Sequence, residues 1–112
     1  MSDTFSLTES GMVHQFFMAK MGHYPTSREA LDRMFEEDDE FLGALEDDNP
    51  AHELKELCDK INTTIGYGLA RGWNVDGAFR AVHQSNMTKQ FTPEGKVQKG
   101  ENYVEPDMEK YL

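Results

Sequence analysis

Hydrophobic residues recur through the first 90 residues at the three- and four-residue spacing that is typical of α-helices. The spacing predicts four helices. The first covers about residues 8–21, the second starts at "TSRE" with a stripe that reaches Leu45, the third runs from "NP" to "RGWN", and the fourth covers about residues 74–89. Their apolar stripes, expected to face the core, are Met12, Val13, Phe16 and Phe17; Leu31, Met34, Phe35, Leu42 and Leu45; Leu54, Leu57, Cys58, Ile61, Ile65 and Leu69; and Val75, Phe79 and Val82.

Capping signals support the starts of these helices. Ser6 with Glu9 and Thr26 with Glu29 have the spacing of a capping box, in which each residue's side chain bonds the other's backbone N–H. The pair Asn49–Pro50 places a capping side chain before a proline at the first helical position. We therefore expect the second and third helices to begin near Thr26 and Pro50.

The periodicity stops after residue 90, where "FTPEGKVQKGENYVEPDMEKYL" follows. This segment is expected to be an extended arm, with a possible turn at "PEGK" and no β-rich stretch. The sequence thus predicts an all-α protein, with a four-helix bundle in residues 1–90 and a C-terminal arm in residues 91–112.

Composition limits the classes of ligand and partner that the protein can be expected to bind. The chain has 112 residues and a formal net charge of −10, which argues against a nucleic-acid polymer or an anionic membrane as a ligand. Its single cysteine, Cys58, excludes an intrachain disulfide, and the stripe position favours a core role over a nucleophile. The polar start and the lack of a long apolar run predict a cytoplasmic protein. The hydrophobic fraction of 38% is modest, which favours burial of a further face against a second copy.

Carboxylates crowd two neighbouring helices, as an unbroken acidic run over residues 36–40 and as Glu56 with Asp59. On helix geometry alone, a solvated acidic face is the more common explanation. The alternative is convergence, because acids three apart share one helix face and antiparallel packing joins two such faces. The converging set would be Glu37, Glu40, Glu56 and Asp59. Hard oxygen ligands of this kind suit Mg²⁺ or Mn²⁺.

The stripe of the fourth helix continues from Val82 to Asn86 and Lys89. Two explanations are open at this point. Either the helix end is solvated, or an amide and an ammonium at the end of a stripe contact a phosphate.

The chain resembles the all-α nucleoside triphosphate pyrophosphohydrolases, the MazG-like superfamily that includes phosphoribosyl-ATP pyrophosphohydrolase. "EEDDE" followed by "ELCD" has the spacing of its EExxE…ExxD signature, and "VHQFFMAKMG", "AFRAVHQSNMTK" and "GKVQKGENYVEPDM" resemble its first helix, last helix and arm. The resemblance implies a helical bundle, an obligate oligomer and cleavage of a nucleoside triphosphate between the α and β phosphates.

The resemblance also implies roles for individual residues. The metal ligands are expected to be Glu37, Glu40, Glu56 and Asp59, binding more than one Mg²⁺ or Mn²⁺ ion that neutralises the phosphates and activates water. Candidate catalytic residues are Glu36, Glu37 and Lys89. The candidate substrate-binding residues are Asn86, Lys89, Lys96, Lys99, Tyr103 and Phe17. The lysines would stabilise the departing pyrophosphate, and Phe17 would stack on the base.

Small stand-alone members of this group are often carried by phages, so a purine deoxynucleotide such as dGTP is the expected substrate, in the host cytoplasm. The alternatives are a phosphoribosyl-ATP pyrophosphohydrolase and a non-enzymatic acidic interaction module. We expect a homo-oligomer, a tetramer ahead of a dimer, with active sites completed across subunits. In it the arm would dock on a neighbour through Tyr103, Val104, Met108 and Tyr111.

Overall fold

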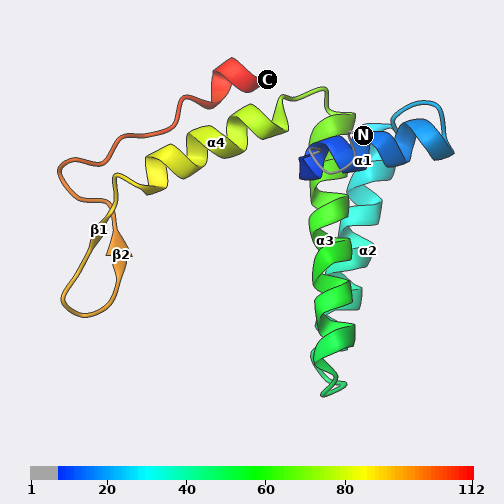
Figure 1. Cartoon of the computed structure of the whole chain (residues 1–112), viewed down its shortest axis with the longest axis horizontal. Helices are drawn as coiled ribbons and strands as arrows, with labels where there is room; N and C mark the ends of the chain where they lie inside the picture. Colours follow the sequence, from blue (N-terminus) through cyan, green and yellow to red (C-terminus); the bar gives the residue numbers. More distant parts are fainter. Residues whose placement is uncertain (1–7) are drawn as a thin grey trace, which may run out of the picture. The chain divides into compact units, whose positions relative to one another are not determined.

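The computed structural model describes residues 8–112 and confirms the all-α class (Figure 1). The elements are α1 (Glu9–Lys20), α2 (Ser27–Ala44), α3 (Pro50–Ala70), α4 (Val75–Asn86), β1 (Gln90–Phe91), β2 (Val97–Gln98) and the 3₁₀ helix η2 (Met108–Tyr111). The chain forms two compact units, the first ending at Trp73 and the second running from Asn74 to Leu112. No helix within residues 8–112 has the length and apolar character needed to cross a membrane.

The N-terminal caps follow the sequence closely. At α2 the Glu29 backbone N–H donates to Thr26 Oγ1 at 3.1 Å, and the Thr26 N–H donates to Glu29 Oε1 at 2.9 Å, so this capping box is confirmed. At α3 the His52 N–H donates to Asn49 Oδ1 at 3.2 Å, behind Pro50. At α1 the cap is Thr8, which accepts from the Gly11 N–H at 3.0 Å. The capping box expected at Ser6 lies outside the described residues.

The first unit is built on α2 and α3, which pack along their length and are joined by a short loop (Figure 1). Asp48 in this loop has a φ of +49°, a left-handed conformation that Asp tolerates better than most residues. At its other end α3 terminates in a Schellman motif, in which the Trp73 N–H bonds the Gly68 carbonyl and the Gly72 N–H bonds the Leu69 carbonyl. Gly72 supplies the required positive φ of +79°.

Helix α1 packs against α3 where α3 has no side chain. A Cβ at Gly66 would lie 3.2 Å from Phe17 Cζ, so the glycine leaves space for the aromatic ring. Val13 is buried beside it and Tyr24 meets the Phe17 ring edge-on, with centroids 5.8 Å apart. Phe17 therefore holds α1 on α3.

The expectation that the apolar stripes of α2 and α3 face the core is wrong for this chain by itself. Leu42 is 61% exposed, and Phe35, Leu45, Leu54, Leu57, Cys58 and Ile61 are also exposed. The buried positions of α2 are instead Ala30, Glu37 and Ala44, seven residues apart and thus on one line along the helix. Alanine permits close approach of the two backbones, which leaves the larger apolar side chains on the outer side.

The second unit corrects two further expectations. Phe79 of the α4 stripe is 75% exposed, and the buried position of α4 is Ser85. The arm is not simply extended, because β1 and β2 pair antiparallel and the Thr92 N–H closes the turn on the Lys96 carbonyl at 2.7 Å. The backbone supports this turn through Gly95, whose φ is +84°.

The arm then returns along α4, as Figure 1 shows. Ser85 Oγ donates to the Val104 carbonyl at 2.7 Å, and the Val104 N–H donates to Thr88 Oγ1 at 2.9 Å. The Asn74 N–H donates to the Tyr111 carbonyl at 2.8 Å, and a Cβ at Gly77 would lie 2.8 Å from the Tyr111 ring. Tyr111, expected as an anchor on a neighbour, is packed on α4 of its own chain.

Candidate metal centre

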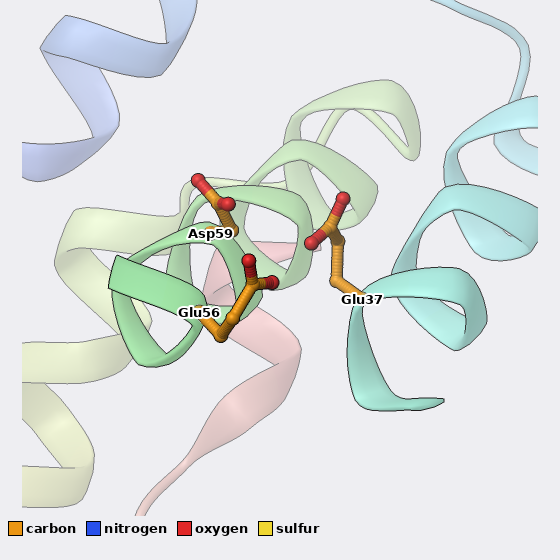
Figure 2. Close-up of side chains that lie close together, drawn as sticks. All are labelled: Glu37, Glu56 and Asp59. Carbon is orange, nitrogen blue, oxygen red and sulfur yellow. The ribbon is translucent and has the colours of Figure 1, made fainter. Parts of the chain in front are cut away.

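Three carboxylates converge between α2 and α3. Glu37 projects from α2, and Glu56 and Asp59 project from one face of α3, where a spacing of three brings them together (Figure 2). One oxygen from each side chain lies within 4.8 Å of the others. The geometric part of the convergence hypothesis is therefore realised for three of its four residues.

Two of these carboxylates are buried. Glu37 is 7% exposed and Glu56 is 6% exposed. Within residues 8–112, neither Glu37 Oε2 nor Glu56 Oε2 has a hydrogen-bond partner. An unsatisfied buried carboxylate oxygen is costly, because burial removes the water that would solvate it. The donor set, hard oxygens in close array with unused lone pairs, fits a divalent cation such as Mg²⁺ or Mn²⁺.

The electrostatics of Glu37 reflect this crowding. Burial raises the pKa of the Glu37 carboxyl above its ordinary value, because the charged form loses solvation. The neighbouring Glu40 and Asp59 carboxylates raise this pKa further, while Arg33 acts in the opposite direction. A cation among these groups would favour the ionised form that the cluster otherwise resists.

Each clustered carboxylate has a basic or imidazole partner four residues earlier on its own helix. Arg33 lies 3.7 Å from Glu37 Oε1, and His52 Nε2 lies 3.5 Å from Glu56 Oε1. Lys55 Nζ lies 2.6 Å from Asp59 Oδ2. That hydrogen bond to Asp59 raises the pKa of the Lys55 ammonium.

Sequence reasoning missed these partners, although their signal was present. Each lies one turn before a proposed ligand, the spacing at which helical side chains meet. The His52 ring is also held through its second nitrogen, because Nδ1 lies 2.7 Å from Asp47 Oδ2. Attention to the acids alone left the basic residues between them unexamined.

The other acids of the motif lie outside the group of three. Glu40 is exposed, although it is close enough to Glu37 to affect its pKa. Glu36 is also exposed and lies 3.6 Å from Arg33. Their predicted roles, Glu40 as a metal ligand and Glu36 as a catalytic residue, stay predictions.

The predicted phosphate-binding residues belong to the second unit. Asn86 is the last residue of α4, Lys89 follows it, and Lys96 lies on the hairpin. Lys99 Nζ lies 3.3 Å from Glu105 Oε1 and 4.9 Å from the centroid of the Tyr103 ring. Lys99 is thus paired within the arm, and contact of these residues with substrate stays a prediction.

The predicted base-stacking residue, Phe17, has a packing role in this structure. Its ring occupies the space at Gly66 and contacts Tyr24. Trp73 is engaged as well, with its ring 4.8 Å from the Arg71 guanidinium carbon and edge-on to Tyr67. Phe16 remains exposed on α1.

The family model described as phosphoribosyl-ATP pyrophosphohydrolase matches residues 4–86. The chain belongs to the phosphoribosyl-ATP pyrophosphohydrolase family. The matched residues include the three clustered carboxylates and reach Asn86, while Lys89 and the arm lie beyond them. No curated protein and no solved structure gives a significant match.

Membership in the phosphoribosyl-ATP pyrophosphohydrolase family establishes the class of activity and confirms the resemblance to the MazG-like superfamily. The protein is a hydrolase of this class, acting on a pyrophosphate bond of a nucleotide. The acidic cluster agrees with the divalent-metal dependence that is general in this superfamily.

Proposed function

We propose that the protein is a metal-dependent pyrophosphohydrolase that cleaves a nucleoside or deoxynucleoside triphosphate between the α and β phosphates, releasing a monophosphate and pyrophosphate. The observation that carries this proposal is the pair of unsatisfied buried oxygens on Glu37 and Glu56, beside Asp59. Such a cluster is explained by a cation that the oxygens hold, and a cation allows an acidic protein to accept a polyanionic substrate.

In the proposed mechanism Glu37, Glu56 and Asp59 would hold the metal, with Glu40 as a fourth ligand. Bound Mg²⁺ or Mn²⁺, more than one ion per site, would supply charge neutralisation and a lowered pKa of the attacking water. Glu36 and Glu37, the candidate catalytic pair on α2, would orient that water. Burial of Glu37 and Glu56 fixes their positions before substrate arrives, which reduces the rearrangement needed during reaction.

The substrate contacts are proposed on chemical grounds. Asn86, Lys89, Lys96 and Lys99 have the amide and ammonium groups that stabilise phosphate oxygens and the leaving pyrophosphate. Tyr103 accompanies Lys99. Phe17, the residue proposed to stack on the base, would need to do so while it packs against α3.

Two substrates are compatible with the family. A purine deoxynucleotide such as dGTP is the first substrate that we propose. Phosphoribosyl-ATP is the second candidate, favoured by the description of the matching family. Both contain a pyrophosphate bond that hydrolysis at an α phosphorus would cleave, so the same cluster serves either.

The test is a product analysis. The protein is incubated with each NTP, each dNTP and phosphoribosyl-ATP, with Mg²⁺ or Mn²⁺, and the products are separated by anion-exchange chromatography. A monophosphate with pyrophosphate supports the proposal, and the preferred substrate separates its two versions. A diphosphate with inorganic phosphate would contradict α–β cleavage. No turnover together with no metal binding would support the acidic interaction module instead.

We also propose that the protein is a homo-oligomer, a tetramer or a dimer, in which α2 and α3 cover their outer apolar residues against a second copy. The large side chains left exposed on these helices are Phe35, Leu42, Leu45, Leu54, Leu57 and Ile61. So many exposed large apolar side chains on two neighbouring helices are unusual on a monomer, because their exposure to water is unfavourable.

A further inference from the structure

Each of the three clustered carboxylates is paired, through one of its oxygens, with a side chain of its own helix. Arg33, His52 and Lys55 each approach a carboxylate from the preceding helical turn. The other oxygens of the two glutamates, Glu37 Oε2 and Glu56 Oε2, are buried without a hydrogen-bond partner in the described part of the chain. The cluster therefore contains oxygens that have side-chain partners and a buried pair of oxygens that have none.

Lys55 differs from the other two partners in its position. Its ammonium lies 2.6 Å from Asp59 Oδ2 and 3.6 Å from Glu56 Oε1, so it bridges both carboxylates of α3. These are two of the three residues whose oxygens converge within 4.8 Å. An ammonium that bridges two carboxylates takes lone pairs that a cation would use.

Lys55 is also the partner best able to leave. Its side chain is 67% exposed, and its stem is flexible. The His52 ring is held through Nδ1, which lies 2.7 Å from Asp47 Oδ2. The Arg33 guanidinium is shared between the carboxylates of Glu36, at 3.6 Å, and Glu37, at 3.7 Å. A displaced Lys55 ammonium is readily solvated, because it starts at the surface.

We propose that Lys55 is a built-in competitor for the metal, which neutralises Asp59 and Glu56 in the metal-free protein and swings into solvent when the ion binds. The inference rests on the proposed metal centre and adds a regulatory role for a residue that is not a ligand. Lys55 raises the metal concentration that is needed for binding, because the ion must displace an ammonium before it binds both carboxylates of α3. The same pairing reduces carboxylate repulsion while the metal is absent.

The competition is tested by metal binding alone, without nucleotide. Mn²⁺ affinity of the metal-free full chain is measured by electron paramagnetic resonance for wild type, Lys55→Met and Lys55→Arg. Lys55→Met keeps the length of the stem and removes the charge, so it should bind Mn²⁺ about fivefold more tightly, which is the scale of an exposed ion pair. Lys55→Arg keeps the charge and should bind close to the wild-type value.

Arg28→Met is the matched control. Arg28 pairs with Asp32 at 3.3 Å with the same four-residue spacing, on α2 and outside the cluster. It changes net charge by the same amount as Lys55→Met, so any tightening that is common to both variants is a general effect of charge. Tightening in Lys55→Met beyond that of Arg28→Met supports competition.

A second measurement guards against altered folding. The rise in melting temperature on adding Mn²⁺ should be larger for Lys55→Met than for wild type, because its metal-free form has lost a counter-charge and its metal-bound form has not. If wild type binds Mn²⁺ and Lys55→Met binds it with equal or lower affinity, the competition is overturned and the metal centre stands. No Mn²⁺ binding by any variant would overturn both.

Discussion

Glu37 on α2 and Glu56 on α3 face each other across the helix pair, and each holds one buried oxygen without a hydrogen-bond partner in residues 8–112. The contact between these two helices is therefore partly a contact between anions. Such a pairing weakens the metal-free fold, because each charge loses solvation and repels the other.

Glu37→Gln should stabilise the metal-free protein. The substitution keeps the shape of the side chain and removes a buried negative charge that Glu40 and Asp59 repel. We expect the free energy of unfolding, measured by urea titration in EDTA at neutral pH, to rise by roughly 1 kcal/mol. Glu36→Gln on the exposed side of α2 is the control, and its effect should be small.

The increase in the free energy of unfolding caused by Glu37→Gln should depend on pH. Because the folded-state pKa of Glu37 is raised, the folded protein binds a proton more readily than the unfolded chain. The wild-type penalty is complete above the raised pKa and is lost as pH falls towards the ordinary value of 4.5. The advantage of Glu37→Gln should shrink over the same interval, and an advantage that grew on acidification would contradict this account.

Asp59→Asn should remove metal binding and turnover while the helices persist. Asparagine is nearly isosteric but supplies no charge, so we expect Mn²⁺ affinity to fall by at least about tenfold. Helix content is followed by circular dichroism, and Asp32→Asn, an exposed acid on α2, serves as the control. Wild-type turnover by Asp59→Asn would exclude this residue as a ligand.

Gly66→Val should loosen α1 from α3. A Cβ alone would reach within 3.2 Å of Phe17 Cζ, and the branches of valine would displace the ring. We expect a loss of about 1–3 kcal/mol in the free energy of unfolding. Gly43→Ala on α2, where a Cβ meets no atom within 4 Å, should instead gain about 0.5–1 kcal/mol.

Leu42→Glu should dissociate the proposed oligomer. Leu42 is the most exposed of the large apolar side chains on α2, and a charge there would have to be buried in the assembly. Light scattering should give an oligomer mass for wild type and a lower mass for the variant. Val97→Glu, an equally exposed position on the hairpin, should leave the mass unchanged. A monomer mass for wild type at micromolar concentration would refute the assembly.

Local signals in the sequence predicted the helices well. Thr26 with Glu29 and Asn49 with Pro50 specify helix starts through contacts within four residues, which no distant part of the chain alters. The three-residue spacing of Glu56 and Asp59 likewise guarantees a shared face. These predictions depended on helix geometry alone.

Which face of each helix is buried within the chain was not predictable in the same way. Hydrophobicity indicated that Leu42 and Phe79 would face the core, yet both are exposed. A stripe shows that a face is to be covered, but it does not say whether the same chain or another one covers it. Hydrophobicity did not indicate the burial of Glu37 either, although its seven-residue relation to Ala30 and Ala44 was present in the sequence.

The attachment of Tyr111 to Asn74 and Gly77 has a consequence for the order of synthesis. Helices α2 and α3 are neighbours in the sequence, so they can pair while the ribosome is still translating the rest of the chain. Helix α4 must wait for almost the whole of the second unit to emerge before its partner exists. A chain truncated within the arm would therefore keep the α2–α3 pair but lack the contacts that Tyr111 makes with Asn74 and Gly77.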